Sequence, residues 1–357
     1  MSTVVNNSSE IKFQDLTFNQ KSHMLTCVVP HGIMVVELDT LKPRLMVSFP
    51  ESITMKCADH YGTTQILYFV SKQDPASLQM WDDDRRRILR KIEMPSEIVR
   101  IHSHYISNHA GYISVILENE VRVFDPSLRN CLRSIVTYKN PGGLCIFSEN
   151  KNSLVLPGTE IGELRWMLPA TSSSPRADTE PVKCHENELQ CIAVNSDGTL
   201  LATTSMRGTL IRLFSVSDDR ELNMIREFRR GSSPVAMSHL CFSHDSQLLA
   251  VISDKNTLHI FYLGHQTHNN YSSLWLLKPM SAYFASEWSM LQIYIPDAPN
   301  TTFKCTFVHD STFTNEYSLY VVGNNGMLYD YSVILPSADE KTVTPTFIEK
   351  RRVKITF

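Results

Sequence analysis

The stretch Leu200-Leu201-Ala202-Thr203-Thr204-Ser205, Met206-Arg207-Gly208, Thr209-Leu210-Ile211-Arg212-Leu213-Phe214 decides the fold. Both outer parts are rich in apolar and β-branched residues, which favour strands. The middle part contains glycine, which is typical of a tight turn. The stretch therefore predicts two antiparallel strands joined by a short connection.

The same pattern recurs along the chain at fairly even intervals. Clear copies occupy residues 247–262 and 318–332, and weaker copies occupy residues 24–38, 65–81, 111–124 and 153–167. Together with the first stretch they make seven copies, spaced on the order of 40–50 residues as in propeller blades. The repeat predicts an all-β fold, a seven-bladed β-propeller of WD-repeat type.

A chain of 357 residues exceeds the usual single-domain size, but a propeller can hold it as one unit. We expect a flexible N-terminus over residues 1–10 and one propeller over 11–357. Runs 11–18 and 343–356 can supply its first and last strands, so the ring should close without a shared terminal strand. The approximate blades are 11–49, 50–95, 96–137, 138–184, 185–230, 231–300 and 301–357.

Two segments interrupt the regular spacing of the repeats. Residues 169–181 contain prolines and a serine run, and residues 264–300 are too long for one hairpin connection. We expect flexible loops at 169–181 and 264–285. Residues 288–295 are interpreted as the strand that returns to the sixth blade.

The overall charge gives no field that would attract anions. Lys and Arg number 34 against 37 Asp and Glu, a formal charge of −3, so any anion site must be local. The eight cysteines show no CxxC pair and no zinc spacing, and most lie in apolar runs. Buried free thiols and the lack of a signal peptide favour a reducing cytosol.

Two adjacent arginines stand out within Phe228-Arg229-Arg230-Gly231. Successive side chains on a strand point to opposite faces, so these two cannot easily serve one site. The planar guanidinium suits phosphate, and the pair therefore suggests two phosphate pockets flanking one edge. The alternative is a solvated pair or a salt bridge, for example with Asp245 or Glu227.

These residues resemble the PROPPIN family of β-propellers, which bind polyphosphoinositides and act in autophagy. The Phe-Arg-Arg-Gly run at 228–231 matches the signature of that family. The resemblance extends over about residues 12–331 and is most specific in 225–262. Further matches are Phe242-Ser243-His244-Asp245-Ser246, Trp81-Asp82-Asp83, Asn140-Pro141-Gly142-Gly143-Leu144-Cys145 and Ser286-Glu287-Trp288-Ser289. Short blade loops and the last of these look closest to the branch that partners the autophagy lipid-transfer protein.

The resemblance implies two phosphoinositide pockets on the rim, for phosphatidylinositol 3-phosphate or 3,5-bisphosphate. The first comprises His185, Ser205, Thr209, Arg212 and Arg229, with Arg212 placed by the family pattern. The second comprises Arg230, Ser243, Ser253, Thr257 and His259. The family often has a second serine where this chain has Ile252. Unperturbed histidines titrate near pH 6.5, which predicts tighter lipid binding at mildly acid pH.

The segment after the sixth repeat carries apolar residues suited to a membrane interface. We assign a membrane insertion loop to Leu274, Trp275, Leu276, Leu277, Tyr283 and Phe284. The alternative is that these residues pack on the propeller edge.

The sequence therefore predicts a membrane-recruitment adaptor in autophagosome formation. It would be cytoplasmic and peripheral on phosphoinositide-bearing membranes such as autophagosome precursors and endosomes, with the lipid-transfer protein as partner by resemblance. No catalytic residue, metal ligand, cofactor or nucleic-acid partner is assigned. The alternatives are a WD-repeat scaffold that binds proteins without lipid, and a propeller hydrolase with catalytic groups at the central channel.

Overall fold

The structure is a computed structural model in which regular structure consists of β-strands throughout the described residues. It describes residues 12–19, 23–107, 110–170, 178–264, 269–271, 287–296, 300–308, 315–336 and 344–356. Within these ranges there is no helix long and apolar enough to cross a membrane.

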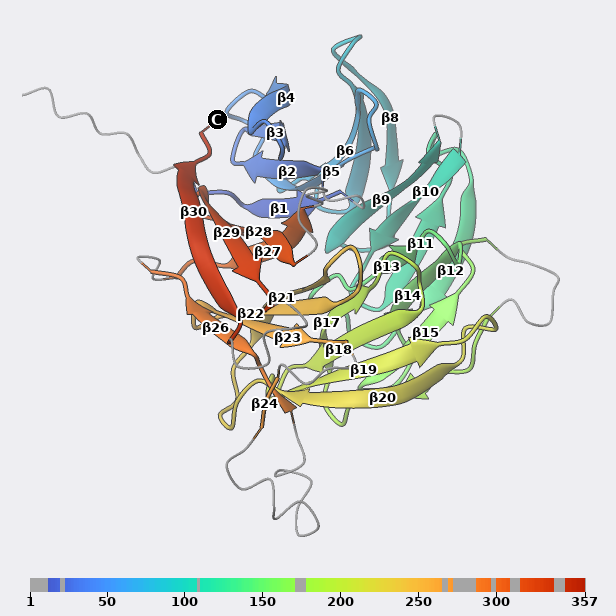
Figure 1. Cartoon of the computed structure of the whole chain (residues 1–357). Coiled ribbons are helices and arrows are strands. Elements are labelled where there is room, and N and C mark those ends of the chain that lie inside the picture. The colour runs from blue at the N-terminus through green and yellow to red at the C-terminus, as the bar shows by residue number, and fades with distance from the viewer. Residues whose placement is uncertain are drawn as a thin grey trace, which may run out of the picture.

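Seven sheets are arranged as blades around a central channel, as Figure 1 shows. The first two blades contain β1 (Asp15–Phe18), β2 (Met24–Val29), β3 (Gly32–Glu37), β4 (Lys42–Ser48), β5 (Met55–His60), β6 (Ile66–Ser71), β7 (Ser77–Asp82) and β8 (Arg87–Glu93). The next two contain β9 (Arg100–Ser107), β10 (Ala110–Ile116), β11 (Glu120–Phe124), β12 (Cys131–Val136), β13 (Ile146–Ser148), β14 (Ser153–Pro157), β15 (Glu163–Met167) and β16 (Val182–Lys183).

The last three blades follow the same plan, with one addition. Blade 5 contains β17 (Leu189–Val194), β18 (Leu200–Ser205), β19 (Leu210–Val216) and β20 (Leu222–Arg229). Blade 6 contains β21 (Met237–Phe242), β22 (Leu248–Ser253), β23 (Thr257–Tyr262) and β26 (Leu291–Tyr294), and blade 7 contains β27 (Phe303–Val308), β28 (Glu316–Gly323), β29 (Met327–Ile334) and β30 (Thr346–Lys354). The addition is a pair of short strands, β24 (Asn270–Tyr271) and β25 (Glu287–Trp288), at the outer edge of blade 5.

The hydrophobic core consists of seven clusters, one between each pair of neighbouring sheets. The inner strands of each sheet are therefore buried on both faces, whereas outer strands such as β8 and β30 are largely exposed. Along β22, for example, Leu249 and Val251 pack toward blade 5, whereas Ala250 and Ile252 pack toward blade 7. Side-chain alternation thus sends consecutive residues into two different blade interfaces.

The ring closes by side-chain packing between the two ends of the chain. Leu16 and Leu25 of blade 1 share one cluster with Val322 and Leu328 of blade 7. The amide of Phe13 also donates a 2.7 Å hydrogen bond to the carbonyl of Asn324. Blade 1 and blade 7 each keep their own four strands (Figure 1), which confirms the predicted closure without a shared strand.

The segment expected to form one returning strand over 288–295 is divided between two blades. Glu287–Trp288 forms β25, which runs parallel to the end of β20 in blade 5. Only Leu291–Tyr294 returns to blade 6, where β26 pairs with β23. The cause is a tertiary contact, because Arg226 on β20 forms an ion pair with Glu287. The prediction of a single strand was wrong in this respect.

The run that contains the two arginines is anchored by its phenylalanine. Phe228 is fully buried, with its ring centroid 5.0 Å from that of Phe261 across the blade 5–6 interface. The substitution Phe228→Ala should lower the free energy of unfolding by about 3–5 kcal/mol, because it leaves a cavity in this cluster. Met224→Ala on the same strand should change it by less than about 0.5 kcal/mol, because Met224 is 57% exposed. Urea unfolding of both variants tests this, and equal shifts would contradict the packing described here.

Candidate functional site

Arg229 is the last residue of β20, the fourth strand of blade 5, and Arg230 follows it directly. Phe228 packs toward blade 6, so alternation turns Arg229 toward blade 4. Arg230 follows the last residue of the strand. Its guanidinium donates from Nε to the carbonyl of Gly208 (3.1 Å) and from Nη2 to that of Ser233 (2.6 Å). The two side chains therefore belong to different blade interfaces.

The face of blade 5 that carries Arg229 also holds a buried polar group of residues. His185 Nε2 lies 2.9 Å from Thr203 Oγ1. Thr203 is opposite Arg212 in the strand pairing. The Arg212 guanidinium donates to Glu227 Oε2 (3.0 Å) and to the carbonyl of Cys184 (2.6 Å). The structure thus brings His185 and Arg212 together on the face of blade 5 that also carries Arg229.

Ser205 and Thr209 flank the turn between β18 and β19. Ser205 is buried on the same face as Thr203, two residues away. Thr209 precedes β19, and its carbonyl accepts a 3.0 Å hydrogen bond from the amide of Arg230. The turn requires glycine at 208, where φ is +60° and a Cβ would lie 1.7 Å from the carbonyl oxygen of Val235. Thr209 therefore positions the second arginine through its main chain.

Ser253, Thr257 and His259 share the face of blade 6 that meets blade 5. Their neighbours Val251 and Phe261 on the same face belong to the blade 5–6 cluster. His259 is buried, with Nδ1 3.2 Å from Ser289 Oγ. The Ser253 hydroxyl is buried and has no hydrogen-bond partner among the described residues. A phosphate oxygen or a water molecule can satisfy such a group, which is costly to leave unpaired.

Ser243 does not belong with these residues, contrary to the prediction. It lies in the turn before β22, whereas Ser253 ends that strand, about 16 Å away at the usual rise of an extended chain. Its hydroxyl donates to Asp245 Oδ1 (2.7 Å) and accepts from the amide of Leu248 (2.8 Å). Ser243 therefore stabilises the opposite turn of blade 6.

Ile252 also lies outside the second pocket. It is fully buried and packs into the cluster shared by blades 6 and 7. Where the family often has a serine, Ile252 therefore alters the core between blades 6 and 7. It takes no side chain away from the face of blade 6 that carries the predicted second pocket.

Three polar neighbours of these sites were not assigned to them from the sequence. Thr203 and Glu227 contact His185 and Arg212 respectively, and Ser289 contacts His259. Strand alternation could have found Thr203, since it lies two residues before Ser205. Glu227, considered from the sequence as a salt-bridge partner of the arginine pair, forms its ion pair with Arg212 through the register of β19 and β20 in blade 5. Ser289 reaches His259 through the return of the chain to β23 in blade 6, which local sequence does not fix.

The segment between β23 and β26 is held against blade 5 at both of its ends, next to Arg229 and Arg230. The Arg226 guanidinium donates to the carbonyl of Leu263 (2.8 Å) and forms the ion pair with Glu287. Trp288 then lies in register with Arg229. The proposed insertion residues, however, lie outside the described residues: Leu274, Trp275, Leu276, Leu277, Tyr283 and Phe284.

Comparison with known proteins decides the family. The PROPPIN family model matches residues 59–297, which is more than half of the chain. The chain belongs to the PROPPIN family. Among curated proteins it is 26% identical to autophagy-related protein 18e of Arabidopsis thaliana, over 71% of this chain and 67% of that one. It is 27% identical to SVP1-like protein 2 of Pichia angusta, over 81% and 82%.

Solved structures confirm the fold of this PROPPIN. Hsv2 of Kluyveromyces lactis superposes with a TM-score of 0.75 at 22% identity, covering 97% of this chain and 100% of that chain. At this identity the likeness concerns the architecture of the propeller alone.

Burial changes the pKa values expected for the two site histidines of this PROPPIN. Burial, with the nearby Arg212 guanidinium, lowers the pKa of His185 to about 4. Burial and Arg230 likewise lower the pKa of His259 to about 4. Both rings are therefore neutral in the free protein between pH 5 and 8. The expectation of tighter lipid binding at mildly acid pH assumed unperturbed histidine pKa values near 6.5. The lowered pKa values no longer support it.

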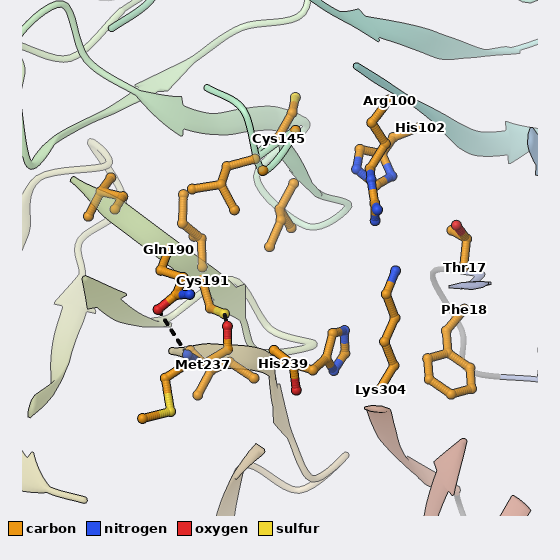
Figure 2. A pocket seen from close by; sticks show the side chains of 18 of the residues that line it. Thr17, Phe18, Arg100, His102, Cys145, Gln190, Cys191, Met237, His239 and Lys304 are labelled. Atoms are coloured by element: carbon orange, nitrogen blue, oxygen red, sulfur yellow. Dashed lines mark hydrogen bonds between the residues drawn. The ribbon is translucent and has the colours of Figure 1, made fainter. Parts of the chain in front are cut away.

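The central channel contains a cavity of about 600 Å³ lined by all seven inner strands. Figure 2 shows Arg100, His102, His239 and Lys304 among its lining side chains. Arg100 Nη2 lies 3.1 Å from Asp15 Oδ1, and burial lowers the pKa of Lys304 to about 8. The carboxylate of Asp59, also at the channel, accepts hydrogen bonds from the amide and hydroxyl of Ser103. The Asp59 contacts join the neighbouring blades 2 and 3, whereas the Arg100–Asp15 pair links blade 3 to blade 1.

The lowered pKa of His185 predicts a stability change in acid. The unfolded ring takes up a proton as the pH falls below about 6.5, whereas the folded ring remains neutral until about 4. Its contribution is complete above pH 6.5 and is lost as the pH falls toward 4, on the order of 3 kcal/mol in all. His185→Gln lacks this contribution, so its free energy of unfolding should decline less between pH 7 and 4.5. Urea unfolding at several pH values tests this, and an unchanged decline would contradict the assignment.

Proposed function

We propose that this PROPPIN is a membrane-recruitment adaptor in autophagosome formation. It binds phosphatidylinositol 3-phosphate or 3,5-bisphosphate through two rim pockets, one on each side of Phe228-Arg229-Arg230-Gly231. The observation that carries the proposal is the division of Arg229 and Arg230 between two blade interfaces. The identity of the lipid comes from the family resemblance, whereas the residues themselves favour phosphate.

The chemistry of the first pocket supports binding of a phosphorylated headgroup. Arg229 supplies a fixed positive charge, and the buried Ser205 hydroxyl lies on the same face of blade 5. Arg212 is held by Glu227 and by a backbone carbonyl, which fixes its position beside His185. A neutral imidazole can still donate one hydrogen bond to a phosphate oxygen.

The second pocket offers a similar set of groups between blades 5 and 6. Arg230 is fixed by two carbonyls, and the Ser253 hydroxyl faces the same interface. His259 lies close enough to Arg230 for the guanidinium to lower its pKa. The ring is therefore neutral, and Arg230 supplies the positive charge to which a headgroup phosphate would bind.

Two pockets on one edge suit attachment to a membrane surface. One headgroup is a weak anchor, and two that engage the same bilayer bind with avidity. The strand β25 starts the return from the insertion segment directly beside Arg229. We therefore propose that the membrane insertion loop, within residues 264–285, reaches the same bilayer, and that the lipid-transfer protein of autophagy is recruited to it. This would place the protein peripherally on autophagosome precursors and endosomes.

Replacing both arginines tests the proposed lipid binding. Arg229→Thr with Arg230→Thr should abolish flotation on liposomes that contain either phosphoinositide, since each charged hydrogen bond contributes about 1.5–3 kcal/mol. The matched control is Arg87→Thr with Arg90→Thr on β8 of blade 2, which removes the same charge elsewhere. The control should float as the wild type does. Persistent flotation of the first variant, with its thermal unfolding intact, would contradict the two arginine pockets, whereas a wild type that does not float would favour a protein scaffold that binds no lipid.

Single substitutions test whether there are two pockets. Calorimetric titration with the soluble inositol phosphate headgroup should give two sites in the wild type and one in Arg229→Thr or Arg230→Thr. Ser253→Ala is a milder change in the second pocket, because its hydroxyl has no protein partner among the described residues. It should weaken one site and leave the other unchanged. Loss of both sites in either arginine variant would contradict the division between two interfaces.

A further inference from the structure

Three potential metal ligands meet between the inner strands of blades 6 and 7. His239 and Cys241 lie on β21, and Cys305 lies on β27. The Cys241 and Cys305 sulfur atoms are 3.4 Å apart, and Cys305 Sγ is 3.8 Å from His239 Nδ1. All three ligand atoms lie within 4.8 Å of one another.

Strand alternation explains why these side chains converge. His239 and Cys241 are two residues apart and share one face of β21, while Leu240 between them packs toward blade 5. Cys241 and Cys305 belong to the cluster between blades 6 and 7. The third ligand comes 64 residues after Cys241. The absence of a local zinc spacing in the sequence therefore did not exclude such a site.

We infer that His239, Cys241 and Cys305 form a binding site for a thiophilic transition-metal ion, with Zn²⁺ as the ion that suits the ligand set. Tetrahedral zinc with bonds of about 2.3 Å to sulfur and 2.0–2.1 Å to nitrogen requires S···S separations of about 3.8 Å and N···S separations of about 3.6 Å. The 3.4 Å between the sulfur atoms and the 3.8 Å between Cys305 Sγ and His239 Nδ1 lie within a few tenths of an ångström of these values, and the His239–Cys241 separation lies within 4.8 Å. Two thiolates and one imidazole form a known ligand set for an open zinc site.

Metal binding would replace contacts that these side chains make in the free chain. The amide of Cys305 donates a long, 3.4 Å hydrogen bond to His239 Nδ1, and a metal ion at this nitrogen would take the place of that donor. Binding of Zn²⁺ to the two thiols would release a proton from each cysteine. One Zn²⁺ with two thiolates carries no net charge, which suits a buried position.

The central channel gives the site an entry path. His239 lines the channel cavity beside Lys304, as Figure 2 shows. Metal can therefore reach the ring from the channel, and a channel water can complete the coordination. A bound ion would join the inner strands of blades 6 and 7. This site is separate from the arginine pair, which lies on the outer strand of blade 5.

Titration of the metal-free chain with Zn²⁺ tests the inference. The full-length protein is kept reduced with a phosphine, and Zn²⁺ is added in competition with a chromophoric chelator. We expect one ion per chain, release of two protons, and a rise in the thermal unfolding temperature. Co²⁺ in place of Zn²⁺ should produce a thiolate charge-transfer band.

Substitutions identify the ligands. Cys241→Ser, Cys305→Ser and His239→Gln should each weaken Zn²⁺ binding by more than the roughly 10–100-fold that loss of an outer-shell partner costs. The matched control is Cys131→Ser, since Cys131 is an exposed free thiol on blade 3, and it should bind as the wild type does. Cys241 is only partly buried, so Cys241→Ser is the mildest change to the fold.

Three results would overturn the inference. The first is the absence of stoichiometric Zn²⁺ binding by the reduced wild type. The second is equal binding by the wild type and the ligand variants, and the third is loss of binding in Cys131→Ser. Liposome flotation of Cys241→Ser should remain normal, so failure of this inference is distinguishable from failure of the proposed lipid function.

Discussion

The structure depends on one constraint, the burial of both faces of the inner strands of every sheet against neighbouring blades. Seven apolar clusters fill the seven interfaces, and they include the contact between the two chain ends. Because side chains alternate along a strand, each residue is committed to one of two interfaces. This constraint places Phe228 toward blade 6 and Arg229 toward blade 4. It also directs Cys241 toward blade 7 while Leu240 faces blade 5.

Polar groups are placed within this packing at the ends of strands, where the apolar layers stop. Ser205 and Ser253 each end the second strand of a blade, and Arg229 ends the fourth strand of blade 5. The histidines behind them are buried enough to remain neutral, so the positive charge of the candidate site comes from arginine. The chain as a whole carries a formal charge of −3, and the neighbouring Arg212 and Arg226 are each paired with a glutamate.

The fold was largely predictable because hairpin spacing and strand alternation are local properties of the sequence. They predicted seven blades, the closure and the separation of the two arginines. They did not separate Ser243 from Ser253, because turns at both ends of a blade use the same polar residues. They also did not predict that Glu287–Trp288 joins blade 5, since an ion pair with Arg226 decides it. The lowered pKa values of the histidines follow from burial, which becomes visible only in three dimensions.

The attachment of β25 to β20 has a mechanical consequence. Chain that leaves blade 6 is fastened to blade 5 by parallel pairing and by the Arg226–Glu287 ion pair before it returns to blade 6. The two blades are therefore linked outside the core as well as through it. A displacement of β25 would therefore act first on the strand that carries Arg229. It would reach blade 6 as well, through the apolar cluster that the two blades share.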